Sequence, residues 1–235
     1  MSQLELALRA GTTQRHVSFV ESGRSVPGRA MLIRLAEALD VPLRDRNALL
    51  LEAGFAPAYP ETRFDDPALG PVRRALERVL DGHLPYPAVI TDRRGDLLAA
   101  NAAFDALVGD AAPELLAPPV SVARLLMHPE GLGSRIRNFD EWGRHVVDAL
   151  RRRGNDDLAT ELAAFLPDHV PTPDHRGHAV PLQLTTPSGE LTLLTTLAHF
   201  GTALDVTVAE LSLESFLPAD EATERLLHAA SSMPS

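Results

Sequence analysis

The sequence predicts an α+β fold in two domains: an all-α domain over residues 1–57, then a five-stranded antiparallel sheet with helices over residues 64–235. Three observations predict it. Apolar residues recur at helical spacing through the first part of the chain, where glycines end successive helices. The segment APAYP at residues 56–60 breaks this pattern and marks the boundary. Beyond residue 85, short apolar runs separated by turn residues indicate strands.

Composition limits the classes of function open to the chain. Its 235 residues, 45% of them hydrophobic, suffice for a packed core in each domain. The absence of cysteine excludes a disulfide scaffold, a thiol nucleophile and a cysteine-ligated metal site. No apolar run approaches about 18 residues, and Met1 is followed by no signal-peptide pattern. We therefore expect a cytoplasmic protein with no membrane partner.

The formal net charge of −10 is unevenly distributed. Residues 1–35 hold five arginines and two acidic residues, a net charge of +3. Residues 64–235 hold 14 arginines and 25 acidic residues, a net charge of −11. Because a nucleic-acid-binding surface needs local positive charge rather than a positive total, the acidic whole does not exclude a DNA partner.

The first domain has the pattern of a helical DNA-binding unit. Ser2 is the expected N-cap of a first helix that Gly11 ends, and Thr13 is the N-cap of a second. Helix, tight glycine turn and helix is the pattern of a helix–turn–helix, whose second helix enters the major groove of DNA. The four expected helices cover residues 4–10, 14–22, 28–40 and 43–53.

The segment SQLELALRAGTTQRHVSFVESGRSVPGRAMLIRLAEALDV, residues 2–41, resembles the lambda-repressor-like (XRE-type) helix–turn–helix. The Ser-Gln start, the Ala-Gly turn and the Glu-x-Gly exit carry the resemblance. It implies that Gln3 touches the DNA backbone or braces the second helix, that the start of this helix faces base edges, and that two arginines lie near phosphates. The alternative is a small helical hairpin with ordinary capping and solvated residues. The expected DNA-binding residues are Gln3, Thr13, Gln14, Arg15, His16, Ser18, Arg24 and Arg29.

The resemblance also implies a helix ahead of Ser2, which this chain lacks. Such a helix would bury several large apolar side chains, worth about 5–10 kcal/mol in all. We therefore expect an incomplete DNA-binding unit. Either Met1 is an internal methionine and translation starts upstream, which we favour, or the protein has lost DNA binding.

The second domain begins with a helix and then changes to strands. Residues 87–91 and 96–100 flank a turn-rich tetrapeptide, which predicts a β-hairpin. Helices follow, and the chain then returns to strands. Two strands, several helices and three antiparallel strands is the order of a PAS-type domain. The other helices are expected at 67–81, after Asn101, and at 120–128, 139–153, 156–166 and 219–230, and the other strands at 179–186, 191–200 and 205–216.

Three segments resemble the C-terminal domain of MmyB-like transcription regulators. They are PYPAVITDRRGDLLAANAAFDAL, the pair VARLLMHPEGL and IRNFDEWGRHVVDALRR, and LAHFGTALDVTVAELSLESFLPADEAT. The resemblance implies a PAS-like sensor that encloses a small lipophilic ligand, such as a fatty acid, between one sheet face and the helices. We expect no other cofactor.

Candidate ligand contacts come from the expected core of this domain. His128 and His199 could pair with a ligand carboxylate, although histidines more often hold a turn. Trp142 could line the pocket, although packing is its simpler role. Asn101 is expected to cap its helix. The full set of candidate ligand residues is Asn101, Phe104, Leu126, His128, Trp142, His199 and Phe200.

Two further clusters are interpreted without function. His169, Asp174, His175 and His178 lie in an irregular proline-rich segment, so no metal site is expected. The acidic residues of the last strand and helix suit solvated positions and an N-cap better than paired catalytic acids; they are Glu210, Glu214, Asp220 and Glu221. None of the common nucleotide-binding, hydrolase or zinc-protease motifs is present, so we predict no enzyme activity.

These observations favour a one-component transcription regulator that binds double-stranded operator DNA and senses a small lipophilic ligand. We expect a homodimer, because two half-sites about 34–36 Å apart need two reading heads. The alternative is a truncated ligand-binding or partner-binding protein that does not bind DNA.

Overall fold

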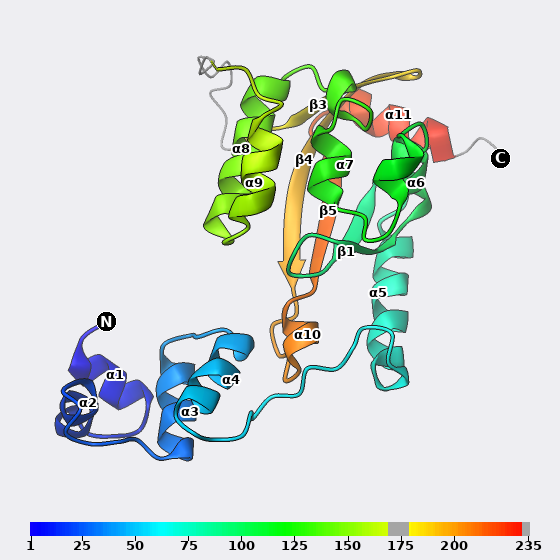
Figure 1. Cartoon of the computed structure of the whole chain (residues 1–235). Helices are drawn as coiled ribbons and strands as arrows, with labels where there is room; N and C mark the ends of the chain where they lie inside the picture. Colours follow the sequence, from blue (N-terminus) through cyan, green and yellow to red (C-terminus); the bar gives the residue numbers. More distant parts are fainter. Residues whose placement is uncertain (169–178, 232–235) are drawn as a thin grey trace. The chain divides into compact units, whose positions relative to one another are not determined.

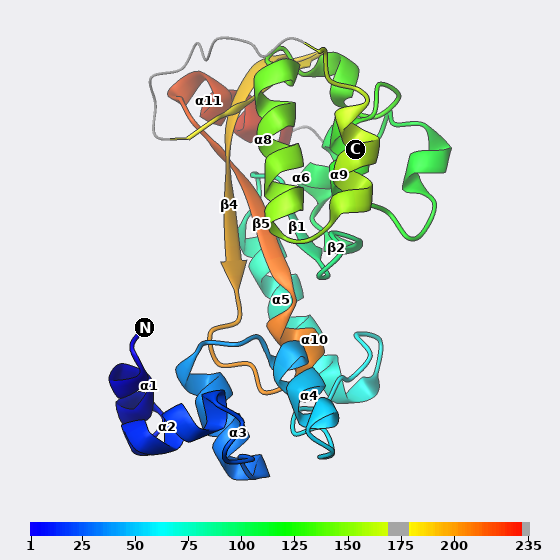
Figure 2. The ribbon, with the colours of Figure 1, turned by 60° about the vertical axis from the view of Figure 1, so that its left-hand side comes forward.

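The computed structural model describes residues 1–168 and 179–231, and the chain divides into two compact units. The first unit comprises residues 1–68 together with residues 201–209, and the second holds the rest of the chain (Figures 1 and 2). The chain therefore passes between the units at three points along its length. No helix of the described residues is long and apolar enough to cross a membrane.

The first unit begins with the predicted helix–turn–helix. The Ser2 hydroxyl accepts from the Glu5 N–H at 3.2 Å, and the Thr13 hydroxyl accepts from the His16 N–H at 3.2 Å, so both predicted N-caps are confirmed. Gly11 has a φ of +60° at the turn, a conformation that glycine adopts without strain. The helices of this unit are α1 (Gln3–Arg9), α2 (Gln14–Glu21), α3 (Arg29–Ala38), α4 (Leu43–Glu52) and α10 (Val206–Ala209).

A small apolar cluster holds the first three helices together. Its buried members are Leu6, Ala7, Ala10, Val17 and Leu35. They come from α1, the turn after it, α2 and α3. A core of this size stabilises the unit through a few large side chains only, each contributing about 1.5–3 kcal/mol.

The strand predicted over residues 205–216 is wrong in its first half. Residues 206–209 form the one-turn helix α10, and the strand begins only at Ser212. The Asp205 carboxylate causes the difference, because it accepts from the Val208 N–H at 3.2 Å and so caps a helical turn. Val206 and Val208 are both buried within this turn.

The second unit contains the predicted five-stranded antiparallel sheet, in the order β2-β1-β5-β4-β3. A hairpin at one edge, an intervening helical region and three consecutive strands confirm the PAS-like, α+β fold class. The strands are β1 (Ala88–Thr91), β2 (Leu97–Ala100), β3 (Leu182–Thr186), β4 (Gly189–His199) and β5 (Ser212–Pro218).

Helices of the second unit cover the sheet, and α8 and α9 lie side by side in both views (Figures 1 and 2). One apolar cluster joins the sheet to α6, α7, α8 and α9, and it includes Phe104, Leu125, Trp142, Leu193 and Phe216. The helices are α5 (Gly70–Gly82), α6 (Ala102–Val108), α7 (Val122–Met127), α8 (Phe139–Arg152), α9 (Asp156–Ala163) and α11 (Glu221–Ser231), with short 3-10 turns η1 (Pro67–Leu69), η2 (Pro113–Leu116) and η3 (Gly133–Arg135).

The strand register assigns residues to the two sheet faces. Glu214 of β5 pairs with Val89 of β1 on one side and with Leu197 of β4 on the other. Directly paired residues project to the same face of a sheet. Because Val89 belongs to the cluster that includes the helices, this row of three residues lies on the face toward that cluster.

Candidate functional site

The expected recognition helix α2 is braced by α1. The side-chain amide of Gln3 donates to the Glu21 carboxylate at 2.6 Å, which joins the start of α1 to the end of α2. Val17, on the inner side of α2, is buried in the core of the unit. The helix is therefore held by its inner side and its C-terminal end, and Thr13, Gln14 and Arg15 at its N-terminal end are exposed.

Exposed arginines lie on α2 and in the segment that follows it. Arg15 and Arg24 both lie over the ring of Phe19, with guanidinium carbons 5.1 and 5.9 Å from the ring centroid. Cation–π contacts of this length orient an arginine without neutralising it. Arg15, Arg24 and Arg29 are exposed, and none of them forms an ion pair with another residue of the described chain.

The arrangement suits a DNA surface. Glutamine can pair with adenine and arginine with guanine in the major groove, and unpaired arginines attract phosphates. The structure places six of the eight sequence-predicted residues on or beside α2, Gln3 contacts α2 from α1, and Arg29 begins α3. His16 and Ser18 are half-buried, whereas Arg24 and Arg29 lie in the exposed segment beyond the helix and at the start of α3.

The apolar ligand candidates lie in the core of the second unit. Phe104 is fully buried and stacks on Phe216, with ring centroids 6.1 Å apart. Leu126 and Trp142 are buried in the same cluster. These three candidates therefore belong to one apolar cluster, which also contains Val89 and Phe216 of the sheet.

Asn101 has a structural role in addition to the predicted cap. Its side-chain oxygen accepts from the Phe104 N–H at 3.1 Å and from the Ala88 N–H at 3.1 Å. Its amide group donates to the carbonyls of Leu80 and Tyr86 at 3.2 and 2.9 Å. These four bonds use the ordinary capacity of the side chain, so Asn101 joins α5, β1 and α6.

The histidines and Phe200 lie at two separate places. His128 accepts at Nδ1 from the Glu130 N–H at 3.1 Å, and its ring packs edge-on against Phe165. His199 is the last residue of β4, and its Nδ1 lies 3.3 Å from the carbonyl oxygen of Leu211. His199 and Phe200 line an apolar cavity of about 140 Å³ with Leu76, Val79, Ala198, Leu211 and Leu213.

Glu214 is a residue that the sequence interpretation missed. It was predicted to be solvated, but it is half-buried on the sheet face toward the helices. Burial raises the pKa of Glu214 from 4.5 to about 7, and the positive charge of Arg153 acts in the opposite direction. A titratable group at this place in a sensor core is a functional candidate. The sequence holds one signal of this burial. Glu214 lies two residues before the buried Phe216 in the same strand, and such residues face the same side of a sheet.

Glu210, also predicted to be solvated, is half-buried and lies 3.9 Å from Arg93, whereas Asp220 and Glu221 behave as predicted. Asp220 accepts from the Thr223 N–H at 2.7 Å, and this bond lowers the pKa of Asp220, as expected for an N-cap carboxylate. Glu221 pairs with Arg225 at 3.7 Å. The cluster His169, Asp174, His175 and His178 lies outside the described residues.

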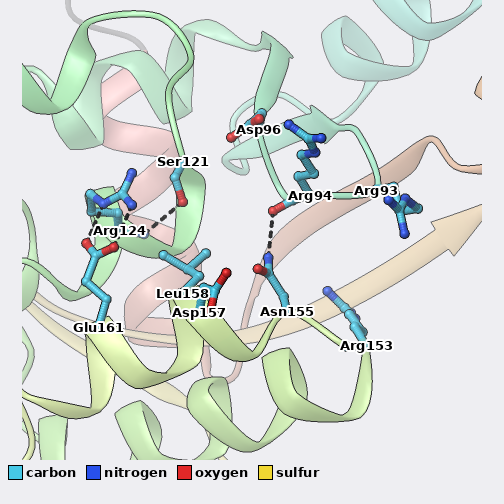
Figure 3. Close-up of a pocket in the computed structure, with 11 residues that line it drawn as sticks. Arg93, Arg94, Asp96, Ser121, Arg124, Arg153, Asn155, Asp157, Leu158 and Glu161 are labelled. Carbon is cyan, nitrogen blue, oxygen red and sulfur yellow. Dashed lines mark hydrogen bonds and ion pairs between the residues drawn. The ribbon is translucent and has the colours of Figure 1, made fainter.

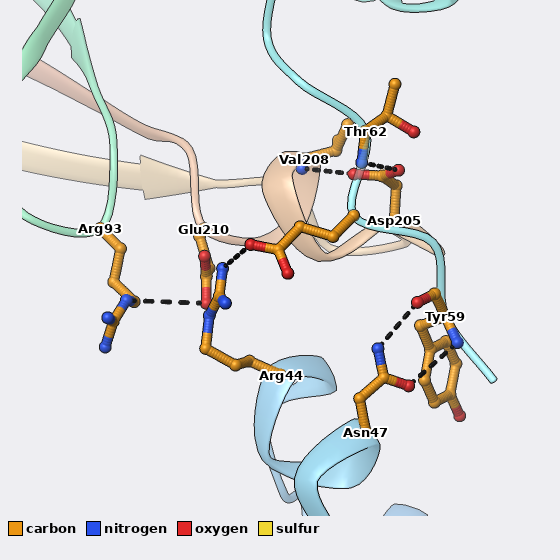
Figure 4. Close-up of polar contacts among 9 residues, drawn as sticks. Arg44, Asn47, Tyr59, Thr62, Arg93, Asp205, Val208 and Glu210 are labelled. Carbon is orange, nitrogen blue, oxygen red and sulfur yellow. Dashed lines mark hydrogen bonds and ion pairs between the residues drawn. The ribbon is translucent and has the colours of Figure 1, made fainter. Parts of the chain in front are cut away.

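A polar network fastens the β4–β5 connection into the first unit. The connector, residues 201–209, contains Asp205, whose carboxylate accepts from the Thr62 N–H at 3.1 Å and from the Val208 N–H at 3.2 Å (Figure 4). The Val206 N–H donates to the Pro60 carbonyl at 2.8 Å. Val206 is fully buried. The connector is thus held by the segment that follows α4.

The same segment is held to α4 by Asn47. Its side-chain oxygen accepts from the N–H groups of Ala58 and Tyr59 at 2.9 and 3.1 Å, and its amide donates to the Tyr59 carbonyl at 2.7 Å (Figure 4). Arg44 of α4 also donates to the Glu61 carboxylate at 2.5 Å. A continuous set of bonds therefore runs from the connector to α4 within the first unit.

Two family profiles match the chain. The profile of the MmyB-like transcription regulator ligand binding domain matches residues 72–230, and a helix-turn-helix profile matches residues 1–45. No curated protein matches the chain.

Solved structures resemble the chain at low identity. An RNA-binding light-oxygen-voltage receptor is 16% identical with a TM-score of 0.34, over 98% of this chain and 57% of the receptor chain. The PAS domain of a protein from Desulfitobacterium hafniense is 15% identical with a TM-score of 0.25, over 57% and 91% of the two chains. A domain of a sensory box sensor histidine kinase/response regulator from Geobacter sulfurreducens is 14% identical with a TM-score of 0.28, over 66% and 99%. This chain thus spans just over half the length of the receptor.

Proposed function

Since the chain belongs to the family of MmyB-like transcription regulators, we propose that it is a one-component switch in which ligand in the sensor sets the affinity of the helix–turn–helix for operator DNA. The observation that carries this proposal is the connector. Residues 201–209 join β4 to β5 of the sensor sheet, yet they fold as part of the first unit. A conformational change in β4 and β5 therefore reaches residues 201–209 through the covalent chain. Hydrogen bonds hold these residues to the segment that follows α4.

The switch is a shift between two populations of conformations. Ligand that binds one arrangement of the sensor sheet better than another stabilises that arrangement by its difference in affinity. Linkage then requires DNA and ligand to alter each other's affinity by the same factor, typically 5–150-fold. The bonds of Asp205 and Asn47 provide the physical connection for this coupling.

The DNA-binding part of the proposal assigns the roles around α2. Thr13, Gln14 and Arg15 contact base edges together with His16 and Ser18. Arg24 and Arg29 contact phosphates, whereas Gln3 braces the helix. The exposed N-terminal end of α2 and its unpaired arginines support these roles. A homodimer reads two half-sites on the operator. Because the target is chromosomal DNA, we assign the protein to the cytoplasm. We assign it no enzyme activity.

The sensor part of the proposal assigns a small lipophilic, fatty-acid-like ligand to the core of the second unit. Phe104, Leu126 and Trp142 gather around one sheet face and support an apolar lining. His128 is the proposed polar contact of this ligand. His199 and Phe200 are proposed to contact ligand at the separate small apolar cavity that they line. Asn101 acts by positioning α6 and β1 rather than by touching the ligand.

Two measurements on the full chain test this function. Native mass spectrometry of the purified protein should report a dimer carrying a lipophilic small molecule that organic solvent removes. DNA selected from a random library by the protein should contain paired half-sites, and Gln14→Ala with Arg15→Ala should abolish the enrichment. The variant Arg225→Ala, which removes an exposed arginine of α11, is the charge-matched control and should keep it. No enriched sequence with the wild-type chain would favour the alternative, a ligand-binding or partner-binding protein that does not bind DNA.

A further inference from the structure

A polar cavity of about 480 Å³ lies in the second unit, apart from the apolar core (Figure 3). The turn between β1 and β2, the start of α7 and the turn between α8 and α9 form its walls. A volume of this size is within the range of small-molecule sites. None of the ligand residues proposed above lines it.

Hydrogen bonds between distant segments build the walls. Arg124 of α7 donates through Nε and Nη2 to the two carboxylate oxygens of Glu161 of α9, at 2.6 and 2.7 Å. The Asn155 amide donates to the Arg94 carbonyl at 3.1 Å, which joins the α8–α9 turn to the β1–β2 turn (Figure 3). The Val122 N–H donates to the Gly95 carbonyl at 3.1 Å. The cavity is therefore formed by segments held to one another, not by a single loose loop.

Four arginines line this cavity in a domain that carries a net charge of −11 over residues 64–235. Arg124 is neutralised by Glu161, and Arg93 lies 3.9 Å from Glu210. The guanidinium groups of Arg94 and Arg153 form no hydrogen bond or ion pair with any residue of the described chain. The hydrogen-bond donors of both guanidinium groups therefore remain available, while their charges also act on Asp96 and Glu214.

The lining holds four arginines and three carboxylates, those of Asp96, Asp157 and Glu161, so its formal charge is +1. Glu161 is paired with Arg124. Burial and the neighbouring Asp92 raise the pKa of Asp96 above its ordinary value, against the opposing charges of Arg94 and Arg124. Asp96 and Asp157 also offer carboxylate oxygens that accept hydrogen bonds from hydroxyl groups. The lining thus suits a molecule that combines a negative group with hydrogen-bond donors.

We propose that this cavity binds a small hydrophilic oxyanion, a metabolite with a phosphate or carboxylate group and hydroxyl groups, and that Arg94 and Arg153 hold its charge. Guanidinium groups match both oxyanions in geometry and form charge-assisted hydrogen bonds with them. The site goes beyond the proposed function, whose ligand is lipophilic and lies in the core. It gives the sensor a second, chemically distinct input.

Isothermal titration calorimetry of the full chain at low ionic strength tests the proposal without DNA. The probes are inorganic phosphate, acetate, glucose 6-phosphate and glucose. At least one oxyanion should bind with a dissociation constant of about 1 mM or tighter, and glucose should not bind. Preference for phosphate or for acetate identifies the recognised group. No binding by any of the three oxyanions at about 10 mM overturns the proposal.

Variants locate the bound anion. The double variant Arg94→Ala/Arg153→Ala should weaken binding at least about tenfold, because both charge-assisted contacts are lost. Arg152 is exposed, precedes Arg153 in the sequence and does not line the cavity. The variant Arg152→Ala should therefore bind the oxyanion as the wild type does. Far-ultraviolet circular dichroism and thermal unfolding should show that both variants fold. Equal binding by the double variant and the wild type overturns the assignment. Either failure leaves the DNA-binding proposal intact, since no DNA is involved.

Discussion

Replacing Glu214 by glutamine removes the ionisable group that β5 carries between Val89 and Leu197. At about 1.36 kcal/mol for each pKa unit, the rise from 4.5 to about 7 corresponds to a penalty of about 3 kcal/mol when the carboxyl is ionised. Below pH 4.5 both the native and the unfolded chains hold the proton, so the penalty is absent. Between pH 4.5 and pH 7 the unfolded chain releases it first, and the free energy of unfolding falls as pH rises.

Urea unfolding followed by tryptophan fluorescence measures this effect in the sensor alone, because Trp142 is the single tryptophan and is buried in its core. We expect Glu214→Gln and the wild type to be equally stable near pH 4.5. The variant should become more stable by up to about 3 kcal/mol above pH 7. Glu114→Gln, at an exposed position, should track the wild type at every pH. A difference between Glu214→Gln and the wild type that does not change with pH would refute the reasoning.

Three further perturbations have defined outcomes. Arg15→Ala should weaken binding to a selected DNA site by about 1–3 kcal/mol and relax sequence preference at one base pair, measured by fluorescence anisotropy, whereas Arg225→Ala should change neither. Arg24→Ala should weaken binding to all sequences alike and lower the slope of log K against log salt by about 1, so an unchanged slope would contradict a phosphate contact. Phe104→Ala should destabilise the sensor by about 3–5 kcal/mol in urea unfolding, because its ring is fully buried; Leu116→Ala, at an exposed position, should cost less than about 0.5 kcal/mol.

Local sequence signals predicted much of the fold. The caps at Ser2, Thr13 and Asp220 depend on a side chain and a backbone N–H a few residues away, so the sequence alone identifies them. The first hairpin was predicted over residues 87–91 and 96–100, and its strands are Ala88–Thr91 and Leu97–Ala100. Short-range chemistry decides these elements.

The features that sequence did not predict depend on distant partners. The alternation of Val206 and Val208 favours a strand, but Asp205 caps a helical turn and bonds Thr62, 143 positions away in the chain. The pKa of Glu214 depends on burial beneath elements from other parts of the chain. The polar cavity likewise requires the β1–β2 and α8–α9 turns to meet, which the Asn155–Arg94 bond records across 61 positions.

The coupling between ligand and DNA tests the central claim most directly. Anisotropy titrations of a selected DNA fragment should compare ligand-loaded with solvent-stripped protein, in the wild type, in Asp205→Ala and in Asp205→Asn. Asp205→Ala removes both hydrogen bonds that the connector carboxylate accepts, whereas Asp205→Asn keeps only one of the two accepting oxygens. We predict at least a fivefold difference in dissociation constant between loaded and stripped wild type. The difference should be lost in Asp205→Ala and reduced, but not lost, in Asp205→Asn. Equal affinities of loaded and stripped wild type, or full coupling in Asp205→Ala, would contradict the account.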